Sequence, residues 1–133
     1  MKISVAILAL FFSVTALDAR GEDGCAHPRS SYDATYCMCK LFVESDKELN
    51  EVYKELSSTI KPDQKKKLVQ VQRKWLKFRD SSCESSGTIN VDCNYKVNKA
   101  RTDALRDRLR ECKTGHCRED LIVQEDWKSG SKE

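Results

Sequence analysis

The stretch 68–83, LVQVQRKWLKFRDSSC, carries the clearest hydrophobic pattern in the chain. Apolar side chains recur there at spacings of three and four: Leu68, Val71, Trp75 and Phe78. This spacing places them on one face of an α-helix, which Val69 and Leu76 widen, while lysines fill the opposite side. Because aromatic side chains dominate core energetics, we expect the rest of the chain to fold over Trp75 and Phe78.

Two neighbouring stretches repeat the helical pattern. The first spans residues 32–60, with this apolar face: Phe42, Leu49, Val52, Tyr53, Leu56 and Ile60. Ser30 or Ser31 can cap its start. Lys61-Pro62 ends it, because the residue before a proline is pushed out of helical geometry and proline suits the first turn of the next helix. The second helix then covers 62–83, and the short connection predicts an antiparallel helical hairpin.

A third helix is predicted over residues 94–112, after a polar loop at 84–92. Its inner side carries Val97, Ala100, Arg101, Ala104, Leu105 and Leu109. The apolar run Leu121-Ile122-Val123 and Trp127 should dock onto the bundle, whereas the last residues should be disordered. The sequence therefore predicts an all-α fold, a small three-helix domain (helical hairpin plus third helix) stapled by disulfides. The domain would span residues 21–117, with 118–133 as a C-terminal tail that is partly docked.

Two motifs in the first two predicted helices carry a family resemblance. They read Asp46-x-Glu48-Leu49-Asn50-x-x-Tyr53 and Gln72-Arg73-x-Trp75-x-x-Phe78-Arg79-Asp80-x-x-Cys83, with Cys37 upstream and Cys93 and Arg101 through Leu105 downstream. In this order they resemble the LprI-type family, small exported helical proteins named after a lysozyme inhibitor. The resemblance covers about residues 25–109 and implies a helical exported protein. Cys39, Cys112, Cys117 and the tail depart from the family pattern.

The start of the chain resembles an export signal. Met1-Lys2 is followed by an apolar run over residues 3–17, the length of a signal-peptide core and too short for a membrane span. We expect residues 1–20 to be a cleaved signal peptide that leaves no stable membrane anchor. The mature protein would then be periplasmic or secreted.

The chain has seven cysteines: Cys25, Cys37, Cys39, Cys83, Cys93, Cys112 and Cys117. In an exported chain they predict a disulfide framework. Cys83 and Cys93 bracket the loop at 84–92, Cys112 and Cys117 can close the turn after the third helix, and Cys25 would pair with Cys37 or Cys39. A bridge between helices, from Cys37 or Cys39 to Cys83, is the alternative. The odd number leaves one thiol free or paired between molecules.

The motif residues are interpreted as structural: Asp46, Glu48, Leu49, Asn50, Tyr53, Gln72, Trp75, Phe78, Arg79, Asp80 and Arg101. Folding the hairpin about residue 61 predicts an Asn50–Gln72 amide pair and an Asp46–Arg79 ion pair, because buried polar groups must find partners. Arg101 is expected to snorkel or to pair with a carboxylate of the first helix. A ligand-binding or catalytic cluster of Asp46, Glu48 and Arg79 is the alternative interpretation.

Several function classes are disfavoured. With 24 basic and 21 acidic side chains the charge is near balance, and no basic patch predicts nucleic-acid binding. The two histidines, His27 and His116, fall in predicted loops, and no catalytic motif is present. The C-x-C spacing of Cys37 and Cys39 is not that of a typical zinc site. We therefore expect neither an enzyme nor a metal or other cofactor.

The resemblance implies a binding protein of the bacterial envelope whose partner is a protein such as lysozyme. The first candidate contact is the polar loop tethered by two cysteines: Glu84, Ser85, Ser86, Gly87, Thr88, Ile89 and Asn90. A tethered loop loses less entropy on docking. The second candidate surface is the acidic face of the first helix around Glu44, Asp46 and Glu51. The alternative function is an interaction, immunity or adaptor module, or a secreted effector, without a lysozyme target.

Overall fold

The computed structural model describes residues 25 and 27–128. The expected signal peptide and the last five residues lie outside this part. The elements follow in the order α1 (Ser31–Thr59), α2 (Pro62–Cys83), β1 (Glu84–Ser85), β2 (Thr88–Ile89), α3 (Val91–Lys113), α4 (Glu119–Ile122) and a final 3₁₀ turn, η2 (Asp126–Lys128). The all-α prediction is confirmed, with one short hairpin and a short fourth helix added.

Local capping explains where the three long helices begin. The Oγ of Ser30 accepts a hydrogen bond from the N–H of Asp33 at 3.1 Å, as expected for a serine cap. Lys61 is extended, with ψ 157°, and its N–H donates to Oε1 of Gln64 at 3.1 Å. Asn90 accepts from the N–H of Cys93 at 3.0 Å, so α3 begins three residues earlier than predicted. The hydrophobic pattern gave no signal for this start, because neither Asn90 nor Val91 marks a break in the spacing of the apolar residues.

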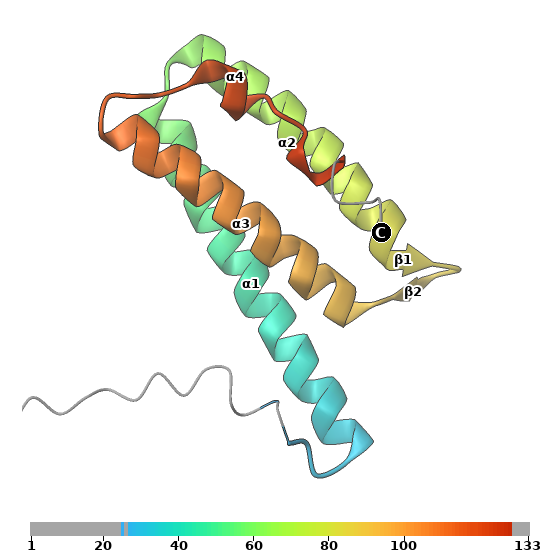
Figure 1. Ribbon diagram of the computed structural model, residues 1–133. Helices are drawn as coiled ribbons and strands as arrows, with labels where there is room; N and C mark the ends of the chain where they lie inside the picture. Colours follow the sequence, from blue (N-terminus) through green and yellow to red (C-terminus); the bar gives the residue numbers. More distant parts are fainter. Residues whose placement is uncertain (1–24, 26, 129–133) are drawn as a thin grey trace, which may run out of the picture.

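The helices form an elongated bundle in which α1 and α3 lie side by side (Figure 1). The closest neighbour of α1 is α3, whereas α2 packs mainly on α3 and α4. The predicted α1–α2 hairpin is present in topology, but α3 supplies most of the surface that covers α1. The first turns of α1 extend past the start of α3 (Figure 1). The β1–β2 hairpin lies at the end of the bundle where α2 ends and α3 begins.

The hydrophobic core lies between the three long helices. Its buried members include Trp75, at 1% exposure, and these residues: Leu49, Leu56, Leu68, Leu105, Leu109 and Ile122. Two expected core residues are exposed. Leu76 is 37% exposed because it follows Trp75 by about 100° around the helix and faces away from α3. Ala100 is exposed at the outer edge of the α2–α3 contact.

The C-terminal segment packs back along α2. Ile122 of α4 is only 3% exposed and belongs to the core. Two lysines of α2 hold this segment from outside: Lys67 pairs with Glu119, and the Nζ of Lys74 lies 2.7 Å from Oε1 of Glu125. The Trp127 ring lies 6.4 Å from the Phe78 ring. This segment therefore covers one side of the α2–α3 contact.

Three disulfides cross-link the chain: Cys25–Cys37, Cys83–Cys93 and Cys112–Cys117. Cys39 is free and exposed. Of the two partners considered for Cys25, Cys37 is the one to which it is bonded. The alternative bridge from α1 to Cys83 is not formed, because Cys83 is bonded to Cys93. Each closed loop is expected to stabilise the fold by about 2–4 kcal/mol. Within residues 25 and 27–128, no helix is long and apolar enough to cross a membrane.

Candidate functional site: the stapled hairpin and its supporting network

Most of the segment expected to be a polar loop, residues 84–89, is a tight β-hairpin. Glu84 pairs with Ile89 and Ser85 with Thr88, and the two residues between them have positive φ, 50° at Ser86 and 77° at Gly87. Two consecutive positive φ values are typical of the two-residue turns that match the twist of a hairpin. The turn forms readily because Gly87 adopts such values without a steric penalty.

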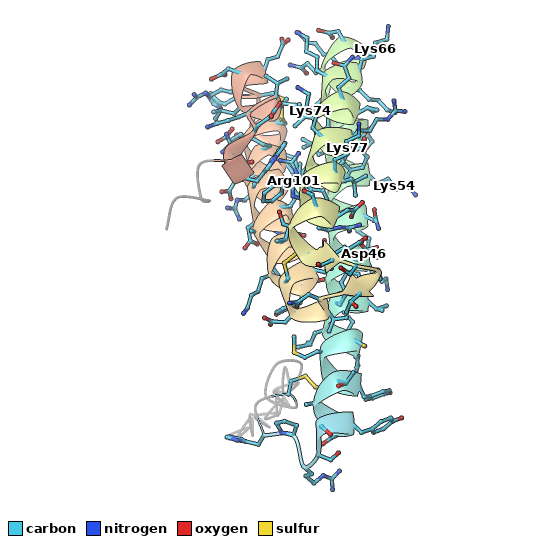
Figure 2. The ribbon with its side chains drawn as sticks, turned by 90° about the vertical axis from the view of Figure 1, so that its right-hand side faces the viewer. Asp46, Lys54, Lys66, Lys74, Lys77 and Arg101 are labelled. Carbon is cyan, nitrogen blue, oxygen red and sulfur yellow. A yellow bond between two sulfur atoms is a disulfide. The ribbon has the colours of Figure 1, made fainter. Side chains whose placement is uncertain are left out.

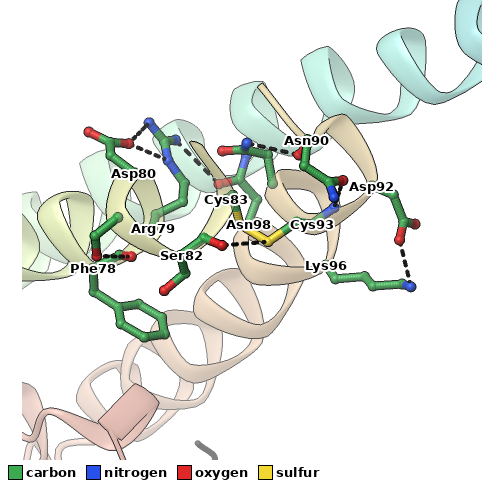
Figure 3. Close-up of a disulfide and its surroundings, with 12 residues drawn as sticks. Phe78, Arg79, Asp80, Ser82, Cys83, Asn90, Asp92, Cys93, Lys96 and Asn98 are labelled. Atoms are coloured by element: carbon green, nitrogen blue, oxygen red, sulfur yellow. Dashed lines mark hydrogen bonds and ion pairs between the residues drawn. A yellow bond between two sulfur atoms is a disulfide. The ribbon is translucent and has the colours of Figure 1, made fainter. Parts of the chain in front are cut away.

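The residues of the hairpin are all exposed, but the hairpin is anchored at its base. Residues 84–90 are all exposed, and the side chain of Ile89 is 56% exposed. Beneath them the Cys83–Cys93 bond joins α2 to α3, with Cys83 itself only 3% exposed (Figure 3). The N–H of Asn90 donates to the carbonyl of Cys83 at 2.9 Å. The side chain of Asn90 also caps α3, so both its backbone and its side chain belong to the support beneath the hairpin. Residues 84–89 carry the outward-facing groups.

A polar network centred on Arg79 supports the hairpin end of the bundle (Figure 3). Its Nη1 lies 3.2 Å from Oδ1 of Asp46 and 3.4 Å from Oδ1 of Asn98, and its Nε and Nη2 donate to Asp80 at 3.2 and 3.1 Å. One guanidinium thus joins α1, α2 and α3. The Arg79 guanidinium also lies over the Trp75 ring, 5.5 Å from its centre. The expected Asp46–Arg79 pair is therefore present, with partners that the sequence did not suggest.

Several members of this network were missed from the sequence. Asn98 is fully buried, and its Nδ2 donates to Ser45, itself 3% exposed, at 3.3 Å. Asn94 is 2% exposed and donates to the carbonyl of Asn90 at 3.0 Å. The spacing of hydrophobic residues does not identify buried polar residues such as these. The available signal was their spacing, because Asn94, Asn98 and Arg101 continue toward the N-terminus the stripe that holds Leu105 and Leu109.

The two carboxylates of the first motif face different partners. Asp46 faces Arg79, whereas Glu48 lies against α3, where it pairs with Arg106 and lies 3.3 Å from Nζ of Lys99. Burial raises the pKa of Glu48, but the hydrogen bonds from Arg106 and Lys99 outweigh it, so its pKa is lowered. These carboxylates do not converge on one point, so the structure does not assemble the Asp46–Glu48–Arg79 cluster considered from the sequence.

The expected Asn50–Gln72 amide pair is not formed. Asn50 is exposed and donates to Asp46 at 3.2 Å, while Oε1 of Gln72 accepts from Nε of Arg101 at 3.1 Å. Because Asn50 reaches water, there is no buried polar gap for it to close. Both amides instead line an open groove of about 380 Å³ between α1 and α2, together with Tyr53, whose pKa is raised by burial.

Arg101 also has partners other than those expected. Its side chain is only 4% exposed, so it does not snorkel, and its Nη1 lies 3.6 Å from Oδ1 of Asp126 in the C-terminal segment. Its guanidinium lies 4.9 Å from the centre of the Trp127 ring. A carboxylate of α1 was expected to pair with it. The sequence could not suggest Asp126, because that contact depends on the chain returning along α2 after α3.

Comparison with known proteins identifies the family of this chain. A family model described as "Lysozyme inhibitor LprI" matches residues 25–105. The chain belongs to the LprI family. No curated protein and no solved structure matches it. Within this LprI-family chain the match spans α1, α2, the hairpin and much of α3, and it ends before the Cys112–Cys117 turn and α4. In the part of the chain that the structure describes, no three His, Cys, Asp or Glu side chains gather into a metal site.

Proposed function

We propose that this protein is an exported lysozyme inhibitor that binds its target without turnover, and that the hairpin at 84–89 enters the enzyme's cleft. The observation that carries the site is that every residue of the hairpin is exposed while its base is covalently anchored. The hairpin stands clear of the bundle, while the Cys83–Cys93 bond and the Arg79 network fix its base. Membership of a family named for lysozyme inhibition supports the partner.

The chemistry of the hairpin suits such a cleft. Glycosidases cleave sugars with a pair of carboxyl groups, so an inserted segment must bring hydrogen-bond donors and avoid additional negative charge. The outer half of the hairpin, residues 85–88, is Ser-Ser-Gly-Thr, which is neutral and carries three hydroxyl donors. Ile89 adds an exposed apolar contact. The acidic side chains, Asp80 and Glu84, stand at the base, where they would meet the basic surface common on lysozymes.

Rigidity supports binding at this position. An unconstrained loop loses about 0.5–1.5 kcal/mol for each side chain that becomes ordered at an interface. Here the paired strands, the positive-φ turn and the disulfide order the segment before any partner arrives. The disulfides support the export part of the proposal, because disulfides persist in oxidising compartments and this protein has three.

The test is a titration of lysozyme activity with the native protein and with two variants of one position. Ser85→Glu places a carboxylate in the outer hairpin, and Ser85→Gln has a similar size without charge. A carboxylate facing the cleft carboxyls is unfavourable by several kcal/mol. We expect Ser85→Glu to need at least about tenfold more protein for half-inhibition, the factor that corresponds to about 1.4 kcal/mol. Ser85→Gln should inhibit within about threefold of the parent.

Ser58 offers the matched control. It is exposed near the end of α1, at the opposite end of the bundle from the hairpin (Figure 1). Ser58→Glu makes the same chemical change there and should inhibit like the parent. If the native protein at high micromolar concentration leaves several lysozymes active, the inhibitor proposal fails and the interaction or immunity module replaces it. If Ser85→Glu inhibits as well as the parent, the site moves to the acidic face of α1 around Glu44, Asp46 and Glu51.

A further inference from the structure

A second hollow lies on another side of the molecule, between α2, α3 and the C-terminal segment. It has a volume of about 430 Å³ and is walled by Trp75, Phe78, Val97, Ala100 and Trp127, with Arg101 among its lining residues. We call it the tryptophan groove. Its size lies within the range of about 300–1,000 Å³ typical of small-molecule sites. Such sites combine apolar walls with few polar groups, as this one does.

Arg101 is the unusual member of this lining. The side chain is 4% exposed, and Figure 2 shows it at mid-height between α2 and α3, beside the C-terminal segment. Its Nε donates to Gln72, and its Nη1 lies 3.6 Å from Asp126. Its Nη2 is buried and has no hydrogen-bond partner in the part of the chain that the structure describes. Buried donors in folded proteins are nearly always paired, because an unpaired one loses its hydrogen bonds to water without replacement, so this nitrogen needs an explanation.

The charges around the groove favour an anionic head group. Lys96 and Arg101 line it with Asp126, so the lining carries a net positive charge. Asp126 is 43% exposed and lies on a single 3₁₀ turn, so a head group can approach the guanidinium beside it. Lys96 at the rim pairs with Asp92 at 2.7 Å, and both side chains are at least half exposed. Burial lowers the pKa of Arg101 to about 10, which still leaves it charged at neutral pH.

We infer that the tryptophan groove binds an amphipathic carboxylate, with the apolar body between Trp75, Phe78 and Trp127 and the carboxylate paired with the guanidinium of Arg101, which lines the groove. Hydrogen bonds from a guanidinium to a carboxylate are roughly twice as strong as those between neutral groups. The aromatic walls supply non-directional apolar contact and so set no strict limit on the shape of the body. This inference is independent of the hairpin and of the proposed function.

Intrinsic fluorescence gives a local test, because the chain has two tryptophans and both line the groove. The native protein is titrated with decanoate, decanol and decylammonium below their aggregation concentrations. We expect a saturable change with decanoate, at least about tenfold weaker affinity for decanol, and no saturable change with decylammonium. Equal affinity for the three head groups, or no response to decanoate, would overturn the inference.

Variants separate the head-group contact from the walls. Arg101→Met keeps an unbranched apolar stem and removes the donor, so the preference for decanoate over decanol should disappear. Because Arg101 also supports the fold, Ala100→Phe provides a second variant. Ala100 is exposed at the groove edge, and a ring there should weaken decanoate binding at least about tenfold by filling the space. Asp103→Phe, on the same helix but outside the groove lining, should bind decanoate like the parent.

Two further results would contradict the inference, one from the Ala100→Phe variant and one from a shortened chain. Unchanged decanoate affinity in Ala100→Phe would place the ligand elsewhere and overturn the inference. A chain that ends at Lys128 tests whether residues 129–133 are the natural occupant. If this truncation raises the affinity for decanoate about tenfold or more, the groove belongs to the chain's own terminus and the ligand site is rejected. Affinity within about threefold of the full chain supports a site for an external carboxylate.

Discussion

Replacing Trp75 with alanine should remove the centre of the hydrophobic core. The indole is 1% exposed, it packs in the cluster that holds Leu49, Leu68 and Leu105, and the Arg79 guanidinium lies 5.5 Å from its ring centre. Truncation of a buried tryptophan is unfavourable by about 3–5 kcal/mol. Loss of the cation–π contact adds about 0.5–2 kcal/mol. A domain of this size has a total stability of about 5–15 kcal/mol, so Trp75→Ala should leave little margin.

The assay is thermal unfolding followed by far-ultraviolet circular dichroism with the disulfides intact. At roughly 4 °C for each kcal/mol, Trp75→Ala should lower the Tm by at least about 12 °C. The next two residues provide matched controls. Leu76 is 37% exposed and Lys77 is exposed, so their alanine variants should stay within about 1 kcal/mol of the parent. A Trp75→Ala variant that melts within the range of these controls would refute the placement of the core around this indole.

Three further predictions concern the ion pairs and the staple. For Glu48→Gln, the loss of stability should be constant above pH 4.5, the ordinary pKa of the carboxyl, and should disappear as the pH falls through the lowered pKa of folded Glu48; urea unfolding from neutral to acid pH measures it. Arg79→Met should destabilise by about 1–3 kcal/mol in urea at neutral pH, because the half-buried Asp46 and the buried Asn98 lose a donor. The double variant Cys83→Ser/Cys93→Ser should lose about 2–4 kcal/mol and keep its helical spectrum, while hydrogen exchange at the hairpin amides accelerates. A pH-independent difference for Glu48→Gln, an unchanged urea midpoint for Arg79→Met, or unchanged hairpin exchange in the double variant would contradict the corresponding contact.

The long helices could be predicted because their signals are local. Spacing of apolar residues placed α1 and α2 within one residue, and Ser30 and Pro62 marked where they begin. The Asp46–Arg79 pair followed from the same hairpin geometry, since a short turn fixes which residues lie opposite each other. Such inferences succeed where sequence separation along a helix determines the position in space.

The contacts that the sequence did not predict depend on how α3 and the C-terminal segment pack back onto the first two helices. Asn98 and Ser45 are 53 positions apart, and nothing local in the sequence identifies them as partners. Arg101 was expected to meet a carboxylate of α1, but Asp126 reaches it because the C-terminal segment doubles back along α2. The tryptophan groove has the same origin, since Trp127 and Asp126 close it from a segment outside the family match. The hairpin was missed because a two-residue strand is too short to show an alternating pattern.

The mode of inhibition tests the central claim most directly. Lysozyme activity is measured over a range of a soluble oligosaccharide substrate at several fixed concentrations of the native protein. A hairpin that occupies the cleft excludes the substrate, so the apparent KM should rise with protein concentration while kcat stays constant. Activity that is unaffected, or a kcat that falls at constant KM, would contradict insertion of the hairpin into the cleft.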